Sequence, residues 1–123
     1  MESILTSIKK MLNIAESYKN FDTDIIIHIN SALMVLTQLG VGPSEGFSIK
    51  DETNTWDEFI PEDRADMESI KSYVYMKVRL LFDPPASSAA VTSMEKLISE
   101  FEFRINVAAE TPIPKEEEED QNG

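Results

Sequence analysis

The stretch FDTDIIIHINSALMVLTQLGVGP, residues 21–43, decides the fold because it specifies one helix and marks both of its ends. Asp22 has a side chain of the kind that caps a helix N-terminus. Gly40 supplies the left-handed residue that commonly follows a last helical turn, and Pro43 prevents the helix from continuing. The sequence therefore predicts one long helix between Asp22 and Gly40.

Apolar residues lie around almost the whole circumference of this predicted helix. They occupy positions 25, 26, 27, 29, 32, 33, 34, 35, 36 and 39. A helix that is apolar on several sides is stable in water only when neighbours cover those sides. We therefore expect it to be the central helix of a bundle or of an assembly of several chains.

Two further helices are predicted on either side of the central one. Apolar residues at helical spacing predict a short helix over residues 3–12, which Asn13 ends in the left-handed conformation. Pro61 suits a first helical position, and it predicts a helix that runs to Asp83, where two prolines follow. The stripe expected to be buried on that helix is Met67, Ile70, Val74, Val78 and Leu81.

A last helix follows, with Ser87 or Ser88 as its cap. Its expected buried stripe is Ala90, Met94, Leu97, Phe101, Ile105 and Ala108, and we expect its outward face to be charged. The four helices together predict an all-α fold, a small four-helix bundle.

Residues 44–60 have a different composition, in which turn-forming residues are mixed with single apolar ones. This pattern predicts a Trp-bearing loop between the second and third helices, or a short hairpin across residues 51–54. A lone tryptophan in such a polar segment either packs back on the bundle or contacts a partner. The second alternative makes four residues candidates for a protein interface: Phe47, Ile49, Trp56 and Phe59.

From residue 110 onward the chain reads ETPIPKEEEEDQNG, with two prolines, an acidic run and little to bury. Such a segment is extended or disordered in isolation. We therefore expect a helical domain over residues 1–109 and an extended acidic C-terminal tail over residues 110–123.

The charge of the chain limits the partners that it can bind. Its 23 acidic and 11 basic side chains give a formal net charge of −12, which disfavours binding to phosphate backbones and to anionic lipid. Lys9 and the other paired basic residues are interpreted as solvated side chains. The absence of cysteine excludes disulfides and thiolate catalysis. Without a long apolar stretch or an export signal, we expect a soluble chain that stays outside the membrane.

The sequence lacks the groups that catalysis needs. His28 is the only histidine, and Asp24 is the only carboxylate placed one turn away on the same helix. The acids near Asp51 do not match a calcium-binding loop, because Trp56 would stand where that loop needs glycine. Phosphate-binding glycine loops and nucleophile motifs are absent from the sequence. We therefore expect no enzyme activity, no cofactor and no metal.

The combined pattern resembles the small head-tail connector proteins of tailed bacteriophages, which are adaptor or head-completion proteins. The resemblance covers residues 3 to about 108, and it rests on four segments: ILTSIKKMLNI, DTDIIIHINSALMVLTQLGVGP, TWDEF and YVYMKVRLLFDPP. It implies a structural virion protein of the head-tail junction, assembled in the host cytoplasm into a cyclic ring, commonly of twelve subunits. The ring would lie under the portal protein, bind a downstream tail or stopper connector protein, and pass DNA through its channel without specific binding.

The residues agree with this resemblance in two respects. A cyclic, heterologous interface would provide the cover that the apolar central helix needs. The segment around Ile113, with Pro112 and Pro114, resembles the C-terminal arms by which such adaptors reach a neighbouring ring. These three residues are therefore further candidates for the interface, and the alternative is a tail that only improves solubility.

The main alternative is an acidic helical DNA-mimic inhibitor of a nucleic-acid-binding protein. The net charge favours this interpretation. The concentration of acids at the C-terminus disfavours it, because a mimic needs ordered carboxylates on a folded face. A small enzyme ranks third, since convergent catalytic groups are lacking.

Overall fold

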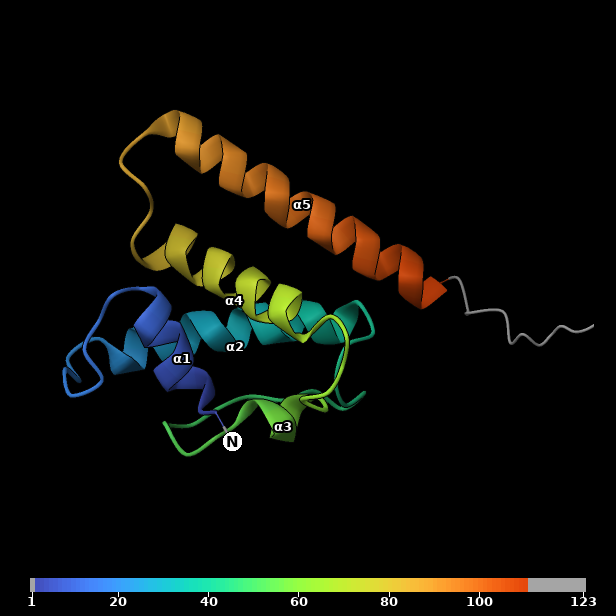
Figure 1. The fold of residues 1–123 in the computed structure, drawn as a ribbon, viewed down its shortest axis with the longest axis horizontal. Helices are drawn as coiled ribbons and strands as arrows, with labels where there is room; N and C mark the ends of the chain where they lie inside the picture. Colours follow the sequence, from blue (N-terminus) through green and yellow to red (C-terminus); the bar gives the residue numbers. More distant parts are fainter. Residues whose placement is uncertain (1, 111–123) are drawn as a thin grey trace, which may run out of the picture.

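The computed structural model describes residues 2–110, and within this range it contains helices and no strand (Figure 1). The all-α prediction is confirmed. The helices are α1 (Ile4–Met11), α2 (Asp22–Gln38), α3 (Trp56–Phe59), α4 (Met67–Phe82) and α5 (Ser88–Glu110). The single turn of α3 lies in the predicted Trp-bearing loop, so four longer helices form the bundle. The acidic tail lies outside the described residues, and its separation from the domain stays a prediction.

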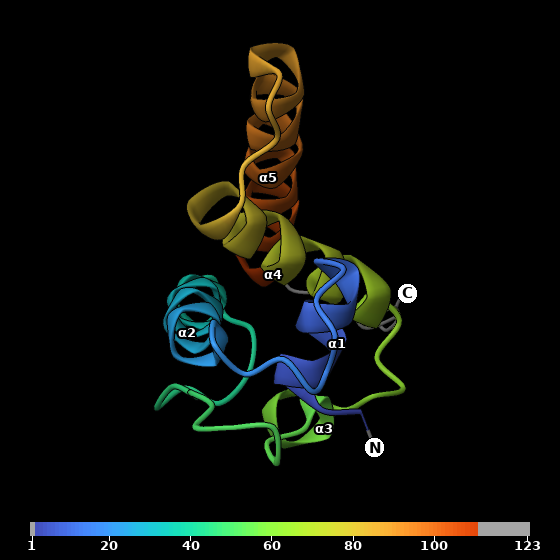
Figure 2. The same cartoon turned by 90° about the vertical axis from the view of Figure 1, so that its left-hand side faces the viewer.

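Helix α4 occupies the middle of the fold. It packs against α2 and α1 on one side and against α5 on the other. Figure 2 shows α5 above α4, with α1 and α2 below it. Helix α5 is therefore an outer layer that has α4 as its main neighbour.

The core lies where α1, α2 and α4 meet. Its buried side chains include Ile4, Leu5 and Ile8 of α1, Ile25, Ile29, Leu33 and Leu36 of α2, and Ile70, Val74 and Val78 of α4. Complete burial of one such aliphatic side chain stabilises a fold by about 1.5–3 kcal/mol. Helix α5 contributes Ile98 as its buried residue within the described part of the chain. The first three long helices therefore provide most of the stability, and α5 adds little to the core.

The C-terminal end of α2 is a Schellman motif, with Gly40 as the left-handed residue that the sequence predicts. Gly40 has φ of 93°, in the left-handed region. The Val41 N–H donates to the Leu36 carbonyl at 2.9 Å, and the Gly40 N–H donates to the Thr37 carbonyl at 3.0 Å. Leu36 and Val41 are both buried, so this turn also closes one end of the core.

The N-terminal end of α2 differs from the prediction. Phe21 is the capping residue, without a side-chain hydrogen bond, and Asp22 is the first residue inside the helix. The Asp22 carboxylate instead forms an ion pair with Lys9, in which Oδ1 and Nζ are 2.8 Å apart. Asp22 pairs with the buried ammonium group and does not cap the helix, because an unpaired buried charge costs more free energy than an uncapped helix N-terminus.

Lys9 is only 2 % exposed, which corrects the expectation of a solvated side chain. Its Nζ donates to the Glu16 carbonyl at 3.1 Å and to the Tyr18 carbonyl at 2.7 Å. The ammonium group therefore has two carbonyl oxygens as hydrogen-bond acceptors and the Asp22 carboxylate as its opposite charge. One side chain of α1 thus fixes the connection over residues 12–21 and the start of α2.

Helix α4 begins at Met67, six residues later than the predicted start at Pro61. Residues 61–66 form turns instead: the Arg64 N–H donates to the Pro61 carbonyl at 3.2 Å, and the Met67 N–H donates to the Arg64 carbonyl at 3.1 Å. Arg64 also pairs with Asp66, with Nε and Oδ1 2.6 Å apart. These local contacts satisfy polar groups of residues 61–66 that the hydrogen bonds of a helix would otherwise satisfy. The predicted end before the two prolines is confirmed.

The stripe by which α5 packs is rotated relative to the prediction. Ile98 is buried and Met94, Phe101 and Ile105 are partly buried, whereas the predicted Ala90, Leu97 and Ala108 are exposed. The cap is as expected, because the Ala90 N–H donates to Ser87 Oγ at 3.2 Å. A helix with one main neighbour buries a narrow stripe, so part of its apolar surface remains in solvent.

The loop over residues 44–60 does not form the hairpin that the sequence left open. Thr55 instead pairs with Ser3 in an isolated antiparallel bridge, and the Trp56 N–H donates to the Glu2 carbonyl at 3.1 Å. Asn30 of α2 holds the middle of the loop, because its side chain accepts from the Ile49 N–H at 2.8 Å and donates to the Ile49 carbonyl at 3.0 Å. These hydrogen bonds therefore fix the loop to the N-terminal segment of the chain and to α2.

Replacement of Lys9 by methionine should lower the free energy of unfolding by about 3 kcal/mol or more. The change keeps the apolar stem but leaves the Asp22 carboxylate and two backbone carbonyls without their cation. Denaturant unfolding followed by circular dichroism measures the loss. Lys10→Met is the matched control: Lys10 is exposed, so its change should stay within about 0.5 kcal/mol. Equal stability of the two variants would contradict this role of Lys9.

Candidate protein-interaction surfaces

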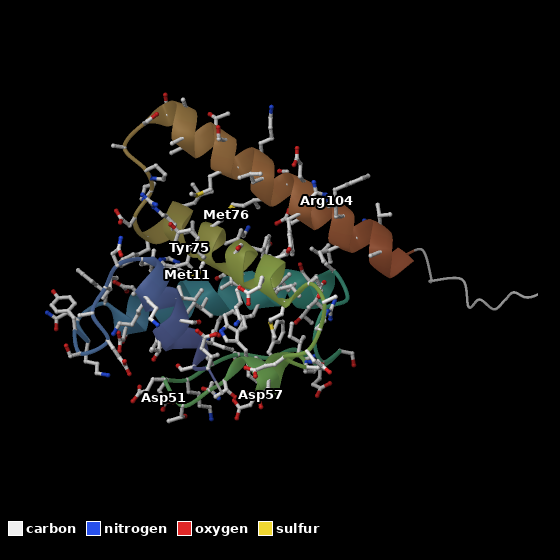
Figure 3. The ribbon with its side chains drawn as sticks, in the orientation of Figure 1. Met11, Asp51, Asp57, Tyr75, Met76 and Arg104 are labelled. Atoms are coloured by element: carbon white, nitrogen blue, oxygen red, sulfur yellow. The ribbon has the colours of Figure 1, made fainter. Side chains whose placement is uncertain are left out.

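The acidic residues of the loop and of α3 serve local structure. Within residues 2–110, no three His, Asp or Glu side chains are grouped in a way that could hold a metal ion. Figure 3 shows Asp51 and Asp57 along the edge of the molecule that lies away from α5. The Asp51 carboxylate accepts from the Thr53 N–H at 2.8 Å, and hydrogen bonds from Thr53 lower the pKa of Asp51. This part of the chain is a tight turn.

Three of the predicted interface residues lie inside the chain's own core. Ile49, Trp56 and Phe59 are buried. The Trp56 Nε1 donates to Ser7 Oγ at 2.8 Å, and this hydroxyl donates to the Ile4 carbonyl at 3.0 Å. Of the two alternatives for the lone tryptophan, packing back on the bundle is the one that the burial matches. A partner cannot reach these three side chains in this conformation.

Phe47, the fourth predicted residue of the loop, is partly exposed and borders a groove. Its ring lies against Phe59, with the ring centroids 5.6 Å apart. The groove has a volume of about 670 Å³ and runs between α2 and residues 44–48. The hydrogen bonds of Asn30 to Ile49 hold the loop beside the helix, so that Phe47 forms one wall. The participation of Phe47 in an interface stays a prediction.

The other wall of the groove is an outward ridge of α2, which we call the α2 ridge and define as Ile27, Ser31, Met34 and Gln38. These residues follow one another at steps of four, three and four, so they share one side of the helix. Ile27 is 55 % exposed and Met34 is 57 % exposed. The apolar circumference of the central helix is thus covered on the core side and open on this one.

Helix α5 is attached to α4 by an aromatic and a polar contact. The rings of Tyr73 and Phe101 stack with their centroids 5.0 Å apart. The Tyr73 hydroxyl donates to Glu102 Oε2 at 2.7 Å, and the Lys77 Nζ lies 3.8 Å from the same oxygen. Burial of Tyr73, and then its hydrogen bond to Glu102, raise the pKa of the Tyr73 hydroxyl.

The opposite side of α5 carries apolar side chains with no helix over them among the described residues. Phe103 is 69 % exposed, and it lies five residues after the buried Ile98, which places it about 140° away around the helix. We define the α5 ridge as Lys96, Glu100, Phe103 and Val107, all of which are exposed. Its charged members agree with the predicted charged outward face, but Phe103 and Val107 do not.

Two smaller pockets lie on either side of α4. One has a volume of about 280 Å³ between α4 and α5, with Met76 and Arg104 in its lining; Figure 3 shows these two residues along that junction. The other, of about 120 Å³, lies where Met11 of α1 meets Tyr75 of α4 (Figure 3). There the Arg79 Nη1 donates to the Tyr75 hydroxyl at 3.0 Å. Neither pocket gathers catalytic groups.

Comparison with models of protein families matches residues 4–112 to the phage connector protein family. The chain belongs to this family. Comparison with curated proteins and with solved structures found no match. The resemblance drawn from the sequence is confirmed, and the chain has a structural role in a phage virion. Phage connectors are structural rather than enzymatic proteins, and this family gives the DNA-mimic alternative no support.

The remaining predicted interface residues of the connector, Pro112, Ile113 and Pro114, lie outside the described residues, so their role stays a prediction. Within residues 2–110, no helix combines the length and the apolar character that crossing a membrane requires.

The exposed members of the α2 and α5 ridges were not selected from the sequence. The only signal for Ile27 and Met34 was the apolar circumference of their helix, and Phe103 lay on a face expected to be charged.

The attachment of α5 in the connector should weaken as the pH rises above about 10, where tyrosine in an unfolded chain ionises. Because the folded chain raises the pKa of Tyr73, it retains this proton after the unfolded chain has lost it, and stability falls. Tyr73→Phe removes this dependence, and at neutral pH it should lower the free energy of unfolding by about 1.5–3 kcal/mol through the lost hydrogen bond to a charged group.

Denaturant unfolding at several values between pH 8 and 11 measures this effect as the difference between the wild type and Tyr73→Phe. Tyr18→Phe is the matched control, because Tyr18 is exposed on the connection before α2. Its stability should fall with pH as in the wild type. If the free energy of unfolding falls equally with pH in the wild type and in Tyr73→Phe, Tyr73 does not hold α5 in this way.

Proposed function

We propose that this connector is the adaptor subunit of a phage head-tail junction. Several copies form a cyclic ring beneath the portal protein, extend the DNA channel and present the surface on which a downstream tail or stopper protein docks. Twelve subunits would match the number common among such rings. This role needs no cofactor, because binding and shape are the whole of its mechanism.

The observation that carries the proposal is the pair of uncovered apolar faces on a chain of the connector family. The α2 ridge exposes Ile27 and Met34, and the α5 ridge exposes Phe103 and Val107. Extended exposed apolar surface on a folded chain marks a site of protein interaction. Two different faces on one subunit support a head-to-tail ring, which requires a heterologous interface.

The charge of the chain supports passage of DNA without specific binding. A formal net charge of −12 opposes contact with phosphates, whose affinity for a protein comes mainly from lysine and arginine. A channel wall that repelled the backbone weakly would let DNA slide. Such a wall also distinguishes this role from that of a DNA-binding protein.

The segment after α5 supports a contact with the portal or with a neighbouring ring. Ile113 stands between Pro112 and Pro114, and prolines lower the ordering cost of an extended segment that docks in a groove or adds to a sheet. In this proposal the three residues form an arm. The alternative, a solubilising tail, remains the outcome to be tested.

The test compares the full chain with a variant that ends at residue 110, each mixed with the portal protein of the same phage. Electron micrographs and native mass spectrometry should show a ring of the full chain on the portal. The shortened chain should melt at the same temperature, because the core lies within the described residues, and it should bind the portal less.

Two results would contradict the proposal at different points. Failure of the full chain to form a ring, alone or on the portal, would contradict the adaptor role. Equal portal binding by the full and shortened chains would be compatible with the ring, but it would show that the segment after residue 110 is only a solubilising tail.

A further inference from the structure

We propose that the α5 ridge of one subunit docks in the groove beside the α2 ridge of the next subunit, so that the groove's occupant is a second copy of this chain. This inference rests on the proposed function and names the contact by which the ring closes. It assigns the groove to α5 of a neighbouring subunit rather than to the portal or to the segment after residue 110.

The order of the helices makes this contact possible between copies and impossible within one chain. Helices α2 and α5 pack on different sides of α4 (Figure 2). The α2 ridge lies on the side of α2 opposite its buried residues, and the α5 ridge lies on the side of α5 opposite Ile98. Both ends of the α2–α4–α5 stack are therefore open. A second copy placed at one end brings its α5 ridge to the open α2 ridge.

The two ridges match in spacing and length. The α2 ridge runs over positions 27, 31, 34 and 38, and the α5 ridge runs over positions 96, 100, 103 and 107. Both repeat at steps of four, three and four, and both rise about 16 Å along their helices. Rows of side chains four residues apart on one helix pack between the equivalent rows on another. Phe103 and Val107 would thus enter the groove between Met34 and Phe47.

Charge favours α5 as the occupant within an acidic chain. The groove has Glu45 as the charged residue in its lining, whereas the α5 ridge carries Lys96 and is flanked by Arg104. The Arg104 side chain is 75 % exposed, and its Nη2 lies 3.7 Å from Glu100 Oε1, so its charge offsets that of Glu100, the one acid of the ridge. Two copies that each carry a net negative charge repel on average. A contact that brings Lys96 and Arg104 near Glu45 opposes this repulsion and fixes orientation.

The contact is heterologous, because each subunit gives its α5 ridge to one neighbour and its groove to the other. Such contacts form a ring when the rotation between neighbours closes, and an open filament when it does not. This geometry predicts a cross-linking pattern that an isologous dimer cannot produce.

Disulfide cross-linking tests the contact without background, since the chain has no cysteine of its own. Met34→Cys and Phe103→Cys replace exposed residues, and circular dichroism should confirm that both variants fold. After mild oxidation on the portal, a mixture of the two single variants should give covalent dimers. Each single variant alone should give none, and the double variant should give a ladder of covalent oligomers. Leu81→Cys, 58 % exposed on α4, is the matched control and should not cross-link to Met34→Cys.

The outcomes separate this inference from the proposed function. Rings on the portal with no link between positions 34 and 103, or between 34 and 107, would overturn the α5 contact and leave the adaptor role intact. A link from Met34→Cys to Ile113→Cys instead would assign the groove to the C-terminal segment and would also overturn it. Dimers of Met34→Cys alone would indicate an isologous contact, against the proposal. If no ring forms at all, the adaptor role and this contact both fail.

Discussion

The fold depends on the ammonium group of Lys9, a buried cation in an acidic chain. Its three oxygen partners come from the connection before α2 and from the first residue of α2, while its stem belongs to α1. Removing a cation from water is costly, and the cost is offset only when an opposite charge and hydrogen-bond acceptors replace the lost water. The α1–α2 crossing is therefore held at one geometry. Helix α4 packs against both α1 and α2, and the buried ring of Trp56 donates its Nε1–H to Ser7 of α1.

Completion of the core by α1, α2, α4 and the Trp-bearing loop leaves α5 outside. The loop is held on α1 and α2 by hydrogen bonds, so it covers one flank of α2 and leaves the α2 ridge open. Helix α5 covers α4 and exposes its own ridge. The features that could serve assembly are thus consequences of the order in which the layers stack. Because the core does not include the two ridges, the chain can bury its core without covering them.

Local rules could be read from the sequence, and long-range contacts could not. The end of α2 before Gly40 and the end of α4 before two prolines depend on residues close in the chain, and both were predicted. The roles of Lys9 and Asp22 depend on a contact between separate elements, so helix capping was assigned where an ion pair forms. Of the candidate interface, the apolar character of Ile27 and Met34 was visible in the sequence, but their exposure depends on which neighbours cover α2. The same reasoning applies to Trp56 and Phe59, which the sequence offered as interface candidates and which the structure places in the core of the chain.

We propose that this connector assembles head to tail through surfaces at opposite ends of one helical stack. The structure of the assembled ring on its portal, determined by electron cryo-microscopy, tests this most directly. We predict that α2 of each subunit faces α5 of its neighbour, with Phe103 beside Met34 and Phe47. A ring in which the groove beside α2 opens to the channel, or is filled by the portal, would contradict it.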